Sequence, residues 1–322
     1  MTYEEVLRKM DCSKTVVKSG MPIKILIGGS PCTEWSVART KDRETTASGI
    51  GWELFVNYLI AKKRLKPDLF LYENNESAAP EIQEQISYEL GVELAHINSG
   101  LLSAQSRERF YAFNWEAEMP KEKGLVLKDI ILPAEAVPSK YWYTDKPYTL
   151  LDTDKAVCAS LDIKAMDIIK RVHNINFKSP TLTCDGKGGH RVKKILQDGK
   201  PRKLMPIEYE RLQTLPDNYT KAVRDSQRYN TIGNGWTAEV IIHILNHALK
   251  DVPRDKELVV LSMYDGIATG RYCLDKMGFT NVKYYAYEID PYAIKIAMSN
   301  YPDIIQCGDA FRVREDQWKI PI

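Results

Sequence analysis

The chain has 322 residues, of which 44% are hydrophobic and 27% are charged. These proportions are ordinary for a folded globular protein and exclude a fibrous or generally disordered chain. No apolar run approaches the roughly 20 residues that span a bilayer, and the first residues are too polar for a signal peptide, so we expect a cytoplasmic protein with no membrane partner.

The six cysteines are scattered without the short spacings of a zinc or redox motif, which predicts reduced thiols and no bound metal. A net charge of +2 indicates no particular partner. The stretch 187–203 is different, because it combines seven lysines and arginines with the single acid Asp198. Such a local positive field favours phosphate binding, with a solvated charged loop as the alternative.

Apolar patterns predict alternating strands and helices in the first part of the chain. We expect strands at 23–27, 69–72 and 92–97, with helices at 52–63 and 81–90 between them. This order favours a parallel sheet with helices on its faces. From about residue 118 to 200 the alternation is lost, which indicates an inserted module. Two further helices follow, at 207–215 and 238–249.

A second strand–helix–strand unit begins beyond residue 257. It contains a strand at 258–264, a glycine-containing turn at 265–270, a helix at 271–277, a strand at 284–287 and a last strand at 303–307. We therefore divide the chain into 1–117, an inserted module at 118–200, and 201–322. The predicted fold class is α/β.

The C-terminal unit has the layout of a nucleotide-type site. A tight glycine turn follows the first strand, and Glu288 ends the second strand, 22 residues after Gly266. A carboxylate at this spacing suits the two hydroxyls of a ribose, and Asp309 after the next strand suits an adenine amino group. The alternative is a turn with a purely structural role.

Cys32 lies just past the end of the first predicted strand, where open α/β sheets build their sites. A lone cysteine is more often a small buried hydrophobe than a nucleophile. Its neighbours decide between the two. The segment around it reads Gly29-Ser30-Pro31-Cys32, and four further motifs follow in the chain: Glu73-Asn74, Gln105-Ser106-Arg107-Glu108-Arg109, the stretch 202–216, and Gly233-Asn234.

These five motifs, in this order, resemble those of the cytosine-C5 DNA methyltransferases. In that family the cofactor motifs precede the cysteine motif, whereas here they follow it, so the sequence resembles a circular permutant. The residues of the motifs around Cys32 and Gly266 are similar to those of the animal de novo DNA methyltransferases. The resemblance implies a Rossmann-like S-adenosylmethionine methyltransferase sheet with helices on both faces, plus a small target-recognition module.

The resemblance also implies a mechanism and its residues. Cys32 would add to C6 of a cytosine, so that C5 becomes nucleophilic enough to take a methyl group. Glu73 would act at N3, and Arg107 and Arg109 would hold the base carbonyl and a phosphate. Because a duplex hides C5 and C6, double-stranded DNA would be bound with the target cytosine flipped out.

The remaining expected contacts fall into two groups. Those expected to hold S-adenosylmethionine are Pro31, Asn234, Gly235, Trp236, Tyr264, Asp265, Gly266, Ile267, Ala268, Thr269, Gly270, Glu288, Ile289 and Asp309. Those expected to contact DNA are Ser36, Gln105, Thr181, Thr183, Lys187, Gly188, Gly189 and Arg191. The stretch 179–189 resembles the family's target-recognition loop, with an ordinary hairpin as the alternative.

The sequence departs from the family pattern at three places: Thr33-Glu34, Asn75 and Gly235-Trp236. The last two are expected near the base and the cofactor, so they bear on which group is transferred. Two other functions stay open. One is an RNA cytosine methyltransferase of the same fold, and the other is an inactive DNA-binding regulatory homologue. We expect a monomer, with a restriction-modification or phage role in a prokaryotic or phage-infected cell.

Overall fold

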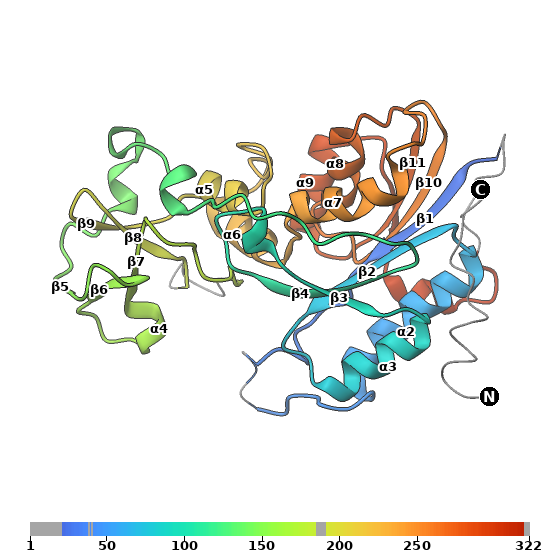
Figure 1. Ribbon diagram of the computed structural model, residues 1–322, viewed down its shortest axis with the longest axis horizontal. Helices are drawn as coiled ribbons and strands as arrows, with labels where there is room; N and C mark the ends of the chain where they lie inside the picture. Colours follow the sequence, from blue (N-terminus) through green and yellow to red (C-terminus); the bar gives the residue numbers. More distant parts are fainter. Residues whose placement is uncertain (1–20, 38, 40, 185–190, 319–322) are drawn as a thin grey trace.

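The structure is a computed structural model that describes residues 21–37, 39, 41–184 and 191–318 (Figure 1). Within this part of the chain, the larger sheet has seven strands in the order β12-β11-β10-β1-β2-β4-β3. Their bounds are β1 Ile23–Gly28, β2 Leu69–Asn75, β3 Leu94–Asn98, β4 Glu108–Phe113, β10 Leu258–Met263, β11 Val282–Tyr287 and β12 Ile305–Gly308.

The two ends of the chain meet in the middle of this sheet. β1 pairs in parallel with β10 over six residues, from Ile23 opposite Leu258 to Gly28 opposite Met263. β1 is also parallel to β2, and β10 to β11. Only β4 among the described strands of this sheet runs against its neighbours, β2 and β3. The carboxyl ends of the parallel strands therefore share one edge of the sheet.

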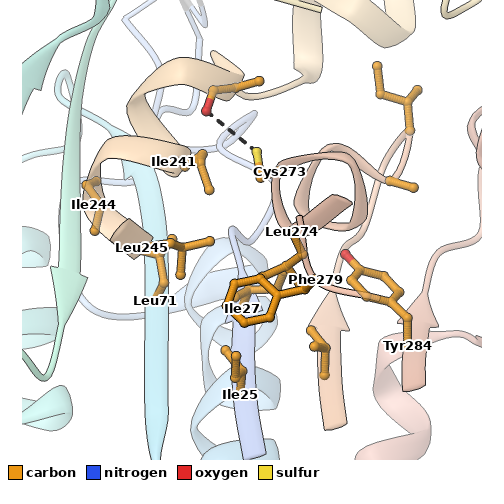
Figure 2. Close-up of a cluster of buried hydrophobic side chains, with 14 of the residues drawn as sticks. Ile25, Ile27, Leu71, Ile241, Ile244, Leu245, Cys273, Leu274, Phe279 and Tyr284 are labelled. Carbon is orange, nitrogen blue, oxygen red and sulfur yellow. Dashed lines mark hydrogen bonds between the residues drawn. The ribbon is translucent and has the colours of Figure 1, made fainter. Parts of the chain in front are cut away.

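Helices cover both faces of the sheet, which confirms the predicted fold class. Ile25 and Ile27 of β1 pack into one core with α7 (Ala238–Leu249), α8 (Thr269–Lys276) and α9 (Pro291–Asn300), as Figure 2 shows for the first two helices. Leu26 points to the other core, with α2 (Gly49–Leu65) and α3 (Pro80–Leu90). This alternation follows from the two-residue period of a strand that is buried on both faces.

The region predicted as an inserted module forms a second sheet, in the order β5-β6-β7-β8-β9. It lies to the left in Figure 1, as a lobe joined to the larger sheet through α5 (Pro206–Leu212) and α6 (Asp225–Asn234). The lobe also holds the single-turn helix α4. Bounds are β5 Tyr148–Leu150, β6 Val157–Leu161, α4 Asp167–Lys170, β7 Arg171–Asn174, β8 Lys194–Gln197 and β9 Lys200–Lys203.

The strands and helices expected from apolar patterns are confirmed, with ends that differ by a few residues. The sequence analysis did not predict α6, α9 or β4, and α6 has few apolar residues to set a helical period. Gly233-Asn234 ends α6, and α7 begins four residues later at Ala238. Short 3-10 helices complete the described chain: η1 Ser99–Leu101, η2 Leu127–Asp129, η3 Ala134–Ala136, η4 Ser139–Tyr141 and η5 Ala310–Arg314. No helix in the described ranges is both long and apolar enough to cross a membrane.

Candidate active site

The ends of β1 and β2 bring the cysteine loop against Glu73. A Cβ atom added at Gly29 would lie 2.7 Å from the Glu73 carbonyl oxygen and 2.9 Å from its carboxylate Oε2. Only glycine allows the loop to come this close. Three residues later, Cys32 lies in the electrostatic environment of Glu73, Arg107 and Arg109. The structure thus brings together the four residues predicted to be catalytic.

The carboxylate of Glu73 is held by a donor at each oxygen. Arg109 Nε lies 3.0 Å from Oε1, because β4 pairs with β2 and sets Arg109 opposite Asn75. The indole Nε1 of Trp236 donates to Oε2 at 3.0 Å. The side chain is only 11% exposed. Sequence reasoning expected Trp236 at the cofactor and did not foresee this contact with Glu73.

A buried hydrogen-bond network fixes the cysteine loop to β2. Ser30 Oγ and Tyr72 Oη lie 2.7 Å apart. Asn74 Nδ2 donates to the Ser30 carbonyl oxygen at 3.0 Å and to Tyr72 Oη at 2.9 Å. Buried polar groups that are satisfied in this way rigidify their surroundings. The family motif residues Ser30 and Asn74 therefore position the loop.

Burial raises the pKa of the Cys32 thiol, and nearby Glu73 raises it further. The guanidinium groups of Arg109 and Arg107 oppose this shift. Because the thiolate is the nucleophile, these two cations favour the reactive form, although burial wins overall. The free site near neutral pH therefore holds Cys32 chiefly as the thiol.

Arg107 joins three segments of the protein. Its Nη1 donates to the Leu182 carbonyl oxygen at 3.2 Å, and its Nη2 donates to those of Gly233 at 3.3 Å and Gly235 at 3.1 Å. Burial lowers the pKa of Arg107 to about 10. Three of its N–H groups thus bind backbone carbonyls, so Arg107 holds these segments together. Its expected contact with the base carbonyl or a phosphate stays a prediction.

Gln105 has a structural role in place of the expected DNA contact. It is completely buried. Its Oε1 accepts from the Leu182 backbone N–H at 2.7 Å, and its Nε2 donates to Gln213 Oε1 at 3.1 Å. A side chain with no exposed surface cannot touch DNA without rearrangement. Gln105 instead ties the expected recognition loop to the segment after α5.

The stretch expected to be the recognition loop lies against the Gly-Asn motif. A Cβ atom at Gly233 would come within 2.9 Å of the Thr183 carbonyl oxygen, so this contact requires glycine. Cys184 Sγ donates to Asn234 Oδ1 at 2.6 Å. Thr181 Oγ1 donates to the Ser106 carbonyl oxygen at 2.8 Å, whereas Thr183 is exposed. Of the two threonines expected to contact DNA, Thr183 therefore has the more accessible side chain.

The basic stretch is only partly at the surface. Arg191 is exposed, but Arg202 is completely buried in an ion pair with Glu208. Lys193 is half-buried, and burial together with the charges of Arg171 and Arg191 lowers its pKa to about 8. Ser36 is half-buried, and its backbone N–H donates to the Cys32 carbonyl oxygen at 3.0 Å. The predicted contacts Lys187, Gly188 and Gly189 lie outside the described residues.

The turn after β10 lies at the same edge of the sheet and has an unusual backbone conformation. Tyr264 and Ala268 have positive φ angles of 60° and 62°. Non-glycine residues with this backbone are uncommon and concentrate at functional sites. Glu288, at the end of β11, accepts from the Gly266 backbone N–H at 2.8 Å. A Cβ atom at Gly270 would lie 2.3 Å from Ile27, so this glycine lets α8 approach the sheet.

Asp265 provides a test of whether this turn suits a cofactor. Tyr284 Oη donates to Asp265 Oδ1 at 2.7 Å, but Oδ2 is buried without a hydrogen-bond partner. Burial raises the pKa of Asp265 to about 7. Next to the acids Glu288 and Asp309, two apolar side chains are exposed, Ile289 by 70% and Phe311 by 37%. An unpaired carboxylate and exposed apolar surfaces fit a ligand with a cation and an aromatic base. Phe311 was not foreseen.

The other expected cofactor residues lie on the same two segments or beside Cys32. Ile267, Ala268 and Thr269 are buried in the turn, and Pro31 is exposed. Gly235 borders the turn, since a Cβ atom there would lie 3.7 Å from Ile267 Cδ1. Among the residues that the structure describes, no group of three or more histidine, cysteine, aspartate or glutamate side chains is placed to hold a metal.

Comparison with known proteins decides the family. The sequence profile of the C-5 cytosine-specific DNA methylases matches residues 7–250. The chain belongs to the C-5 cytosine-specific DNA methylase family. The matched range includes Cys32, Glu73 and Asn234, and it ends before β10, so the predicted cofactor motifs of this family member lie beyond it.

Three relatives are type II methyltransferases of bacteria. Identity is 27% to M.AplI of Arthrospira platensis, over 65% of this chain and 64% of that protein. It is 27% to M.Bsp6I of a Bacillus species, over 71% and 79%, and 25% to M.SsoII of Shigella sonnei, over 68% and 62%. The matched region therefore spans less than two thirds of M.AplI and M.SsoII.

A similar solved structure is that of a putative DNA modification methyltransferase encoded within a prophage (E. coli). It is 17% identical, with a TM-score of 0.47, and the match covers 78% of this chain and 84% of that one. The assignment to the family does not depend on this likeness.

Proposed function

We propose that the protein is a DNA (cytosine-5-)-methyltransferase that uses S-adenosylmethionine. One observation carries the proposal. The Cys32 loop, the Arg109–Glu73 ion pair and the glycine turn after β10 all lie at the edge of one sheet where its parallel strands end. A nucleophile, an acid for the ring and a nucleotide-type pocket at one edge suit attack on a flipped base.

Cys32 would begin the reaction by adding its Sγ to C6 of the target cytosine. This addition shifts the π electrons of the C5–C6 double bond toward N3 and gives an enamine whose C5 is nucleophilic. Arg109 and Arg107 favour the thiolate that attacks. After C5 is methylated, water near Cys32 would take the C5 proton, the C5–C6 double bond would form again, and Cys32 would leave C6 as the thiolate.

Glu73 would offset the negative charge that develops at N3. It can do so by donating a proton or a strong hydrogen bond to this atom. Arg109 fixes one carboxylate oxygen, so the orientation of the group is set before the base arrives. Such preorganisation avoids rearrangement during the reaction.

The residues after β10, β11 and β12 would hold the cofactor. Glu288 suits the ribose hydroxyls, Asp309 the adenine amino group, and the exposed Ile289 the adenine ring. Asp265, whose Oδ2 is buried without a hydrogen-bond partner, would attract a cationic amino group of the cofactor through its charge and without direct contact. When bound, S-adenosylmethionine supplies the methyl group.

Double-stranded DNA would lie between the second sheet and the Cys32 loop. Arg191 and Lys193 of the module would contact phosphate, and Thr183 would lie near the flipped base. The cytosine must leave the helix for Cys32 to reach C6.

We also infer that the chain is a circular permutant within its family. The family profile ends at residue 250, and the strands that carry the predicted cofactor residues follow it. They complete the sheet beside β1, so the pocket needs both ends of the chain.

A covalent trap tests the proposed chemistry. Duplex DNA with 5-fluorocytosine at the target retains the cysteine adduct, because fluorine cannot leave C5 as a proton does. With S-adenosylmethionine, the wild type should form a DNA–protein band in a denaturing gel, and Cys32→Ala should form none. The matched control Cys273→Ala changes a buried cysteine of α8 outside the site and should trap normally. Equal trapping by Cys32→Ala would disprove the assignment.

A substrate panel separates the remaining alternatives. Transfer of label from methyl-labelled cofactor to duplex DNA in preference to tRNA supports the proposal. Preference for tRNA would indicate an RNA methyltransferase. A protein that binds DNA but labels neither would be a regulatory homologue. Bisulfite sequencing of DNA from expressing cells would then give the recognition sequence.

A further inference from the structure

The contact between Trp236 and Glu73 links two segments that approach the site from different directions. Glu73 lies near the end of β2, whereas Trp236 lies between α6 and α7. The indole Nε1 donates to Oε2, and Arg109 occupies Oε1. A carboxylate oxygen can accept two hydrogen bonds, so Oε2 keeps a lone pair that can carry the proton that Glu73 would donate to N3 of an incoming base.

Trp236 sits on a rigid turn. The carbonyl oxygen of Gly235 accepts from Arg107 Nη2 at 3.1 Å and from Gln213 Nε2 at 3.0 Å. Thr237 Oγ1 donates to Gln213 Oε1 at 2.8 Å. These donors hold the backbone on both sides of Trp236. A rigid donor fixes the orientation of its acceptor more strictly than a mobile one.

The indole ring also packs against the larger hydrophobic core. Its neighbour Gly235 borders the predicted cofactor turn, since a Cβ atom there would lie 3.7 Å from Ile267 Cδ1. The Cβ position of Gly29 lies 3.5 Å from Trp236 Nε1, so the cysteine loop borders the same ring. Trp236 therefore touches the acid and the loop of the nucleophile, and its neighbour borders the cofactor turn.

We infer that Trp236 is a positioning residue that fixes the Glu73 carboxylate for the flipped cytosine through its indole N–H. This inference rests on the proposed methyltransferase activity. It gives Trp236 a role in the chemical step, separate from the expected contribution of its ring to the cofactor pocket.

Trp236→Phe tests the inference because it removes the N–H and keeps an aromatic ring. We expect kcat for DNA methylation to fall about ten- to a hundredfold, the range for one hydrogen bond to a charged group. KM for DNA and Kd for S-adenosylhomocysteine, measured by calorimetry, should stay within about threefold of wild type. The matched control is Trp115→Phe, which removes an indole bond to the Ile244 carbonyl oxygen outside the site and should keep kcat.

A double-mutant cycle with Glu73→Gln provides a second measurement, read as the rate of 5-fluorocytosine trapping. If Trp236 acts through Glu73, Trp236→Phe should slow trapping much less in the Glu73→Gln background than in the wild type. If the effects of the two substitutions on the trapping rate multiply in the double variant, the inference is overturned. An unchanged kcat in Trp236→Phe would also overturn it, as would a weaker Kd for S-adenosylhomocysteine together with an unchanged kcat at saturation. A wild type that traps no DNA would instead overturn the proposed function and this inference together.

Discussion

At the scale of single residues, the site depends on close contacts that leave no room for a larger side chain. Gly29 lies against Glu73, Gly233 lies against Thr183, and Gly270 lies against Ile27. Each contact joins segments that are distant in the sequence. The glycines are therefore needed for close approach, and none of these three has the positive φ that would make its backbone the reason.

Gly29→Ala should reduce activity more than stability. Its Cβ would lie 2.9 Å from Glu73 Oε2 and 2.7 Å from the backbone oxygen, so the cysteine loop or the carboxylate must move. A displacement of about 1 Å at a reacting group can cost a hundredfold in rate, and we expect kcat to fall by about that factor. Steady-state methylation assays measure the change.

The control for Gly29→Ala is Gly199→Asn. Gly199 has a φ of 75° in open space, a conformation that asparagine tolerates. This variant should methylate DNA at the wild-type rate. Equal rates for Gly29→Ala and wild type would contradict the packing argument.

Asp265 should make stability depend on pH. Its pKa is about 7 in the folded protein against 3.8 ordinarily, so the folded state binds more protons between these values. The free energy of unfolding should therefore fall as pH rises through this window. The variant Asp265→Asn keeps an acceptor for Tyr284. Between pH 5 and 8, its free energy of unfolding should fall by roughly 2–4 kcal/mol less than that of the wild type.

Urea unfolding of the cofactor-free protein at pH 5, 6, 7 and 8 measures this effect. As pH rises, the free energy of unfolding of the wild type should fall steadily relative to that of Asp265→Asn. Parallel curves for the two proteins would show that Asp265 ionises normally.

At the scale of elements, α5 anchors the second sheet to the rest of the protein through buried charge. Arg202 at the end of β9 donates to both carboxylate oxygens of Glu208 on α5, at 2.8 and 2.6 Å. Glu208 also accepts from the backbone N–H groups of Met205 and Leu132. Both charged side chains are completely buried, so neither can turn to water if the other is lost.

Arg202→Met should lower the free energy of unfolding by about 3–5 kcal/mol, because it leaves the Glu208 carboxylate buried without its cation. Urea denaturation measures this loss. Lys155→Gln breaks an exposed pair with Asp152 in the same lobe and should change stability far less. A similar small effect in both variants would mean that water reaches Glu208.

At the scale of the whole molecule, one sheet is assembled from both ends of the chain. β10, β11 and β12 follow the region that matches the family profile, yet β10 pairs with β1 at the centre of the sheet. Leu258 and Val260 share a core with Ile25 and Ile27. Without β10, β11 and β12, one edge of β1 would have no strand to pair with.

Cutting the chain between α7 and β10 should therefore leave the folded protein intact. A protease site inserted after the exposed Asp251 allows the cut after folding. The two pieces should elute together in size-exclusion chromatography and keep most of their methylation activity, because six parallel residue pairs and a shared core hold them. The uncut insertion variant is the control, and separate elution at micromolar concentration would contradict the prediction.

The sequence by itself determined the family motifs, the helices and strands with strong apolar periods, and the acids and glycines of the C-terminal unit. It could do so because these features are local: a strand, its turn and the residue after it lie within about ten positions of one another. Cys32, Glu73 and Arg109 were found in this way, and the structure brings them together.

Only the tertiary structure decided what these residues touch. Trp236 and Glu73 are 163 positions apart, and Arg107 reaches carbonyl oxygens 75 to 128 positions away. The burial of Gln105, the antiparallel β4 and the pairing of β1 with β10 have the same origin. Such contacts depend on how the elements pack, and no pattern within a short window of sequence encodes that packing.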